Sequence, residues 1–162
     1  KQESVCAMIN IGARFSNMNI TTGGYPYFTR DILWGGIDVT NRIKELLGLN
    51  PDEAEALKRN PGERKREIIG VIMPALEKFI SEIRMSFDYF EAQFGKNVER
   101  LYISGGTAYL FNMLDFLKEN LEVDVILWNP FKGIKIIDEL FDKEFRNSPG
   151  KFAAAMGLAL RK

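Results

Sequence analysis

Two glycine-containing segments, each directly after an apolar segment, have the residue types that could bind an anion. They are residues 10–16 (NIGARFS) and residues 104–107 (SGGT). Glycine leaves backbone N–H groups open to a ligand, and such groups can hold a phosphate. A hairpin turn is the better explanation of the first segment taken alone, and a tight strand-to-helix turn explains the second equally well. Together they favour a ligand site, because open α/β sheets bind ligands in the loops beyond their strand ends.

Three strands are expected to position the first of these segments. Residues 5–11 are apolar on both faces, which is typical of a strand in the middle of a sheet. Residues 17–21 alternate polar and apolar side chains, and residues 25–32 are rich in aromatic and β-branched side chains. Between these two strands, Gly23 and Gly24 can adopt the positive φ angles of a two-residue hairpin. We therefore predict three antiparallel strands.

Helices and two further strands are expected to follow. Apolar spacing predicts helices at 37–47, 50–58, 109–118, 136–145 and 149–161, and a long helix that ends near Phe94. Pro74 is expected to kink the long helix or to separate two helices. The apolar stripe along the long helix is predicted to pack in the hydrophobic core. Strands at 98–103 and 123–127, joined by helical crossovers, should lie parallel to their neighbours. The sequence thus predicts an α/β fold with a mixed sheet.

The composition excludes several kinds of chemistry. The chain has 162 residues, about one domain, and 22 basic residues balance 22 acidic ones, so no general attraction to nucleic acid or lipid is expected. There is no histidine, which excludes a Ser-His-Asp triad, a Cys-His pair and an ordinary zinc site. The single cysteine suits a reducing compartment. No apolar segment approaches the roughly 20 residues of a membrane helix, so no direct membrane span is expected.

Five motifs in order resemble the second half of the actin-like ATPases, and among them most closely the PilM-like proteins of type IV pilus assembly, with FtsA-like cell-division proteins more distant. Residues 10–16 resemble the second phosphate motif, and 103–107 (ISGGT) the adenosine motif. Residues 28–40 resemble the return strand with its GG-x-x-x-T helix start. Residues 54–58 (AEALK) resemble an A-E-x-x-K segment, and 153–161 (AAAMGLALR) the closing helix, in which Gly157 would allow close packing.

The resemblance implies a ribonuclease H-like, actin-type fold in which the nucleotide binds between two halves. Residues 1–34 and 95–162 would form the core subdomain 2A, and residues 35–94 an inserted helical segment, similar to subdomain 2B, with the long packing helix. The phosphates of ATP are then expected at Asn10, Gly12, Ala13, Arg14, Phe15 and Ser16. The adenosine is expected at Gly105, Gly106, Thr107 and Tyr109, closed by Glu55 and Lys58. The first half, with its own phosphate loop, is absent, so the chain is expected to be a fragment.

One departure from the family motif concerns hydrolysis. The second phosphate motif normally begins with Asp, which helps to organise Mg²⁺ and the attacking water, and here the position is Asn10. An amide cannot act as a base or offer a full charge to a cation. We expect ATP and Mg²⁺ binding in the full-length protein, weak or absent ATPase activity, and no activity of the fragment alone.

The resemblance implies a cytoplasmic scaffold, peripheral to the inner membrane through its partners. The N-terminal peptide of PilN is expected on the missing half, and other pilus assembly proteins or a second copy of the chain are further candidate partners. Three alternatives stay open: an interaction module with a vestigial nucleotide site, an FtsA-like cell-division protein, and a small-molecule kinase of the same fold, against which Asn10 argues.

Overall fold

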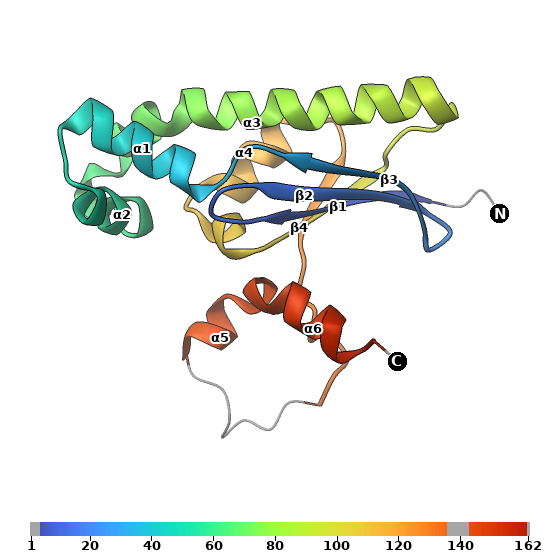
Figure 1. Ribbon diagram of the computed structural model, residues 1–162. Helices are drawn as coiled ribbons and strands as arrows, with labels where there is room; N and C mark the ends of the chain where they lie inside the picture. The colour runs from blue at the N-terminus through green and yellow to red at the C-terminus, as the bar shows by residue number, and fades with distance from the viewer. Residues whose placement is uncertain (1–3, 136–142, 162) are drawn as a thin grey trace.

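A five-stranded sheet in the order β3-β2-β1-β4-β5 is the centre of the computed structural model, which describes residues 4–135 and 143–161 (Figure 1). The strands are β1 (Val5–Ile11), β2 (Ser16–Thr22), β3 (Tyr25–Ile32), β4 (Arg100–Ser104) and β5 (Asp124–Leu127). The pairs β1–β2 and β2–β3 are antiparallel, whereas β4 is parallel to both β1 and β5. The predicted mixed sheet and the central position of β1 are therefore confirmed.

The β2–β3 connection is the tight hairpin that the sequence predicts. Gly23 and Gly24 have φ angles of 60° and 85°, so both central residues of the turn lie where side chains are disfavoured. The turn pairs Thr22 with Tyr25 and sets the register of the hairpin, apart from one irregularity after Ile20.

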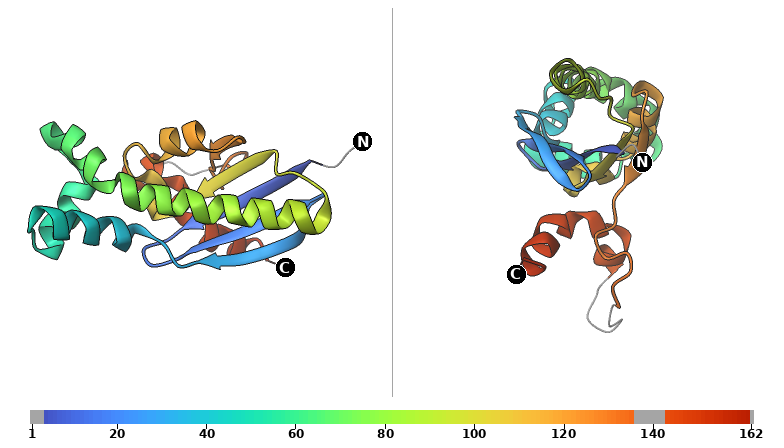
Figure 2. Two further views of the ribbon diagram at one scale, coloured as in Figure 1. Left: turned by 90° about the horizontal axis from the view of Figure 1, so that it is seen from above. Right: turned by 90° about the vertical axis from the view of Figure 1, so that its right-hand side faces the viewer.

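Three helices follow β3. They are α1 (Gly36–Leu47), α2 (Pro51–Arg59) and, after a 3-10 turn η1 (Gly62–Arg64), α3 (Lys65–Phe94). Gly48 ends α1 with a φ of 63°, as the sequence indicates. Asn50 and Glu53 form the predicted capping box of α2, because each side chain accepts a hydrogen bond from the backbone N–H of the other. Both α1 and α2 project beyond the ends of β1 and β4 (Figure 2).

The long helix α3 lies across one face of the sheet (Figure 1). It continues through Pro74 as one helix of 30 residues, so the alternative of two separate helices is wrong. Most of its predicted apolar stripe is buried: Ile68, Ile72, Leu76, Phe79, Ile80, Ile83 and Phe90. Phe94, at the end of the stripe, is exposed and packs its ring edge-on against Tyr27.

The C-terminal third differs in detail from the prediction. The predicted helix 109–118 is shorter in the structure. A 3-10 turn, η2 (Gly106–Tyr109), ends at Tyr109, and α4 (Met113–Asn120) begins only after Asn112, whose φ is 65°. The segment predicted as helix 149–161 is a 3-10 turn, η4 (Pro149–Phe152), followed by α6 (Ala153–Ala159). Of the predicted helix 136–145, residues 136–142 lie outside the described residues, and α5 (Lys143–Asn147) covers the rest.

Close packing at Gly157 is not observed. A Cβ atom built on Gly157 would meet no described atom within 4 Å, and of the residues of α6 only Ala153 is buried. The C-terminal segment with α5 and α6 lies on the side of the sheet opposite α3 (Figure 1). Among the described helices, none combines the length and the apolar character that a membrane span requires.

Trp34 connects the sheet, α1 and α3. Its side chain is fully buried and stacks on Phe79 of α3, with ring centroids 4.1 Å apart. Its indole Nε1 donates a hydrogen bond to the Ala75 carbonyl (2.9 Å), and its own carbonyl accepts one from the Ser16 hydroxyl (2.9 Å). This residue therefore fixes the start of α1 against the core.

Candidate functional site

The loops after β1 and β4 lie side by side because the two strands are parallel and paired. Asn10 is opposite Ser104 in the register, so both strands end at the same edge of the sheet. Beyond that edge, the Thr107 hydroxyl donates a hydrogen bond to the Gly12 carbonyl (2.8 Å). The two glycine segments identified in the sequence are thus in direct contact.

The loop after β1 is closed on itself and on the start of α1. The Gly12 N–H donates to the Phe15 carbonyl (3.1 Å), so it is already engaged. The carbonyls of Gly12 and Ala13 accept hydrogen bonds from the N–H groups of Gly36 (3.0 Å) and Ile37 (2.8 Å). A Cβ atom on Gly35 would lie 2.6 Å from the Ala13 carbonyl, which explains why a glycine precedes α1. The loop and the helix start therefore form one unit.

Helix α2 brings an ion pair to the same place. The ammonium of Lys58 lies 2.6 Å from the Glu55 carboxylate and donates to the Gly36 carbonyl (3.2 Å) and the Thr40 hydroxyl (3.0 Å). Thr40 Oγ1 also lies 2.7 Å from Glu55. The exposed Arg59 forms a second ion pair with Glu55 at 3.0 Å. These contacts attach α2 to the first turn of α1.

The pKa of Glu55 reflects this network. Burial by itself raises the pKa, but hydrogen bonds from Lys58, Thr40 and Arg59 outweigh burial and lower the pKa from 4.5 to about 2. A carboxyl with a lowered folded-state pKa stabilises the fold fully above pH 4.5, and this contribution is lost as the pH falls towards 2.

Glu55→Gln is therefore expected to lower the free energy of unfolding at neutral pH, and this destabilisation should disappear in acid. The difference between wild type and variant should shrink as the pH falls from about 4.5 towards 2. Urea denaturation at a series of pH values measures it. In a Lys58→Met background the pH dependence should be weaker, because a main partner of the carboxylate is gone. A difference that stays constant with pH would contradict this account.

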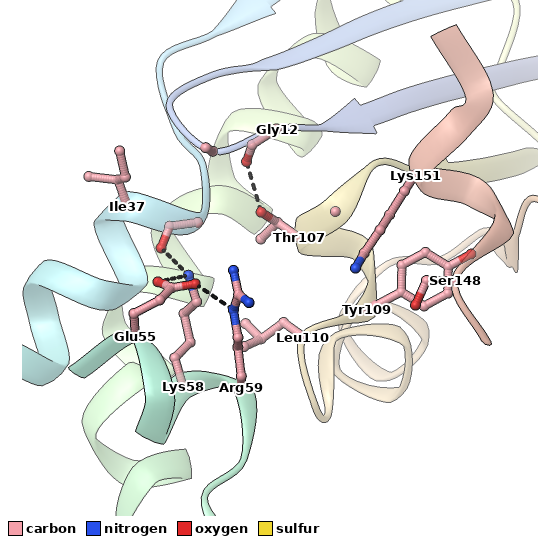
Figure 3. A pocket seen from close by; sticks show the side chains of 13 residues that line it. Gly12, Ile37, Glu55, Lys58, Arg59, Thr107, Tyr109, Leu110, Ser148 and Lys151 are labelled. Carbon is pink, nitrogen blue, oxygen red and sulfur yellow. Dashed lines mark hydrogen bonds and ion pairs between the residues drawn. The ribbon is translucent and has the colours of Figure 1, made fainter. Parts of the chain in front are cut away.

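A cavity of about 610 Å³ lies between these elements (Figure 3). Its lining comes from the loop after β1, the starts of α1 and η2, helix α2 and the turn before α6. The lining residues are Gly12, Ala13, Gly36, Ile37, Glu55, Lys58, Arg59, Gly106, Thr107, Tyr109, Leu110, Ser148 and Lys151. Three of these side chains are basic and one is acidic, so the cavity suits a negatively charged ligand.

The structure brings together seven of the twelve residues that the sequence indicates. Those that line the cavity are Gly12, Ala13, Glu55, Lys58, Gly106, Thr107 and Tyr109. Asn10, Arg14, Phe15, Ser16 and Gly105 do not line it. The Asn10 side chain lies against Gly105, and the buried Ser16 hydroxyl bonds to Trp34. Arg14 and Phe15 belong to the loop after β1, but their side chains are exposed, and Phe15 keeps 51% of its surface accessible.

Six lining residues are not among the predicted site residues. Gly36, Ile37, Arg59 and Leu110 lie in or next to the motifs, whereas Ser148 and Lys151 were missed entirely. Both belong to the chain around η4, and they reach the cavity because Gly150 between them contacts Tyr109 and Gly105. No local motif marks these residues, since their place depends on a contact between segments 41 residues apart. The apolar spacing of this segment indicates only a helix, and it gives no sign of a contact with the cavity.

The cavity has the size and lining of a site for a small anionic molecule rather than for a bare metal ion. Its volume is within the range of about 300–1,000 Å³ that is usual for small-molecule sites. Glycine-lined backbone and basic side chains are suited to phosphate groups. Among the described residues there is no group of three or more Asp, Glu, Cys or His side chains that could hold a metal ion. The described side chains therefore offer no carboxylate cage for Mg²⁺.

The architecture is an actin-type α/β fold. The chain is similar to the ethanolamine utilization protein EutJ from Carboxydothermus hydrogenoformans (20% identity, TM-score 0.69, covering 97% of this chain and 49% of that one). It is also similar to MreB5 of Spiroplasma citri bound to ADP (13% identity, TM-score 0.70, 98% and 53% covered). At these identities the similarity shows the fold alone, and it agrees with the predicted actin-type α/β fold.

The family within this class follows from the sequence. A family profile described as type IV pilus assembly protein PilM matches residues 1–162, and the chain belongs to this family. A solved structure described as a PilM-PilN type IV pilus biogenesis complex is similar at 29% identity with a TM-score of 0.87, covering 98% of this chain. The match covers 46% of that chain, so this sequence spans about half the length of the solved relatives.

Proposed function

We propose that this chain is the nucleotide-binding part of an actin-like scaffold protein in type IV pilus assembly. The observation that carries the proposal is that both glycine loops and the Glu55–Lys58 pair line one and the same cavity. In this arrangement Gly12 and Ala13 face the phosphates of ATP. Gly106, Thr107 and Tyr109 shape the adenosine end, which Glu55 and Lys58 close from α2.

ATP hydrolysis by this site is expected to be weak or absent. Asn10 replaces the acidic residue that the related motif carries, and its side chain lies beside Gly105 outside the cavity lining. An amide neither accepts a proton from water at neutral pH nor contributes a full charge to a cation. Nucleotide binding therefore acts in this proposal as a structural signal rather than as a source of turnover.

The assembly partners belong to the same proposal. The PilM–PilN complex supports PilN as a partner, and we place its N-terminal peptide on a second half of the protein that pairs with this one across the nucleotide. The protein would then act in the cytoplasm and reach the inner membrane through PilN and other pilus assembly proteins.

Calorimetry with ATP and Mg²⁺ on the intact protein that contains this chain tests the proposal. Wild type should bind, and Lys58→Gln should weaken binding by about tenfold, as expected when a charged hydrogen-bonding group is lost. Lys44→Gln is the matched control, because Lys44 does not line the cavity. Absence of binding by wild type would overturn the proposal.

One observation favours a second candidate, an interaction module with a vestigial nucleotide site. The loop after β1 uses its Gly12 N–H and two of its carbonyls for internal hydrogen bonds, and Asn10 has replaced the acid. This candidate predicts that PilN binding is the same with and without ATP. Loss of PilN binding on removal of the nucleotide would count against it.

A further inference from the structure

Two hydrogen bonds join the adenosine-side loop to the turn before α6. The N–H of Gly150 donates to the Tyr109 hydroxyl (2.7 Å), and the N–H of Gly105 donates to the Gly150 carbonyl (3.0 Å). Gly150 is therefore held through its donor and its acceptor by the segment that follows β4. We call this pair of bonds the Gly150 clamp.

The clamp needs a glycine at its centre. A Cβ atom on Gly150 would lie 2.8 Å from the Tyr109 hydroxyl and 2.9 Å from the Trp128 carbonyl. Both distances are shorter than real Cβ atoms show, so a side chain would push the turn away from Tyr109. Gly150 is also buried, so its N–H would lose a partner without being returned to bulk water if the Tyr109 hydroxyl were removed.

The clamp sets the position of a wall of the cavity. Ser148 and Lys151 flank Gly150 and both line the cavity, and Figure 3 shows the Lys151 side chain directed into it. Phe152 of η4 also packs against Phe145 and Phe131, with ring centroids 5.0 Å and 6.4 Å away, so the turn is held both by the clamp and by this aromatic contact. Since the clamp bonds the residue directly before Lys151, the place of the Lys151 charge relative to Lys58 and Arg59 depends in part on Tyr109.

We propose that Tyr109 is a positioning residue whose hydroxyl, through Gly150, holds the 148–151 turn as a wall of the site, and that Lys151 on this turn selects for anionic ligands. The inference rests on the proposed nucleotide function and deepens it. Tyr109 is one of the residues that line the cavity, and its hydroxyl accepts the hydrogen bond from the backbone of the turn. Tyr109 thus belongs to the lining and also holds the turn.

A double-mutant cycle in the intact protein tests the inference, with binding of ATP and of uncharged adenosine measured by calorimetry. Lys151→Gln should weaken ATP binding by about tenfold and change adenosine binding by less than about twofold, because only ATP carries the charge. Tyr109→Phe should weaken ATP binding several-fold. The double variant should be little worse than Lys151→Gln, because Tyr109 acts through Lys151.

Controls separate this inference from the proposed function and from loss of folding. Tyr102→Phe removes a hydroxyl from β4 outside the cavity lining and should bind ATP as wild type does. Because Lys151 is exposed, Lys151→Gln should fold even where Tyr109→Phe is too unstable to purify, and its ATP-to-adenosine ratio is then the deciding measurement. If wild type binds ATP, this inference alone is overturned by either of two results. The first is that the effects of Tyr109→Phe and Lys151→Gln add up in the double variant, and the second is that Lys151→Gln weakens ATP and adenosine binding equally. Absence of wild-type binding would overturn the proposed function too.

Discussion

Gly105→Ala is expected to destabilise the fold by about 3 kcal/mol, whereas Gly106→Ala should leave stability unchanged or slightly raised. Gly105 has a φ of 90°, and a Cβ there would lie 2.4 Å from the Ile11 carbonyl oxygen and 2.5 Å from Asn10 Oδ1. The backbone of β1 cannot move away without breaking its pairing with β4. Gly106 has an ordinary φ, and its Cβ would meet nothing within 4 Å.

Substitutions at the two neighbouring glycines therefore distinguish an effect on folding from an effect on binding. Gly106 lines the cavity, so Gly106→Ala should keep the fold and weaken ATP binding by placing a methyl group where the ligand approaches the backbone. Guanidinium denaturation followed by circular dichroism gives the stability of both variants, and calorimetry gives the affinity of Gly106→Ala. Equal stability of the two variants would show that the strand-to-loop contact is not as close as described.

The sheet and most helices could be predicted because their signals are local. The Gly23–Gly24 turn, the Asn50 capping box and the alternation in β1 each act within a few residues, and the structure follows them. The left-handed conformation of Asn112, directly before α4, has no comparable signal. It interrupts a segment whose apolar spacing alone indicates one continuous helix.

The motifs of the sequence indicate the part of the cavity lining that follows β1 and β4 or lies on α2, but not the part around η4, which depends on tertiary contacts. The pairing of β1 with β4 brings Gly12 to Thr107, as expected for parallel neighbours. Ser148 and Lys151 reach the cavity only through the Gly150 clamp. Gly157 was expected to be the closely packed glycine of this segment, but the structure gives that place to Gly150.

The same contacts indicate how a bound nucleotide would affect the rest of the chain. The loop after β1 is hydrogen-bonded to the start of α1, α2 is joined to α1 through Lys58 and Thr40, and η4 is held by Tyr109. A ligand that contacts all three walls would stabilise them together, because it binds only where they are assembled. The elements around the cavity, rather than the sheet, are where nucleotide should change hydrogen exchange.

Trp34→Ala is expected to lower the free energy of unfolding by about 3–5 kcal/mol, the usual range for loss of a fully buried aromatic side chain. The variant removes the stack on Phe79 and leaves the Ala75 carbonyl without its indole donor. Because Trp34 directly precedes Gly35 and the start of α1, the variant should also leave the α1 side of the cavity less firmly positioned. Trp128→Ala is the matched control, since Trp128 keeps 38% of its surface exposed. Because the chain has two tryptophans, Trp128→Ala also lets fluorescence report on Trp34 alone. Denaturation of both variants decides the matter: similar losses would mean that Trp34 does not join the sheet to α3 as the structure indicates.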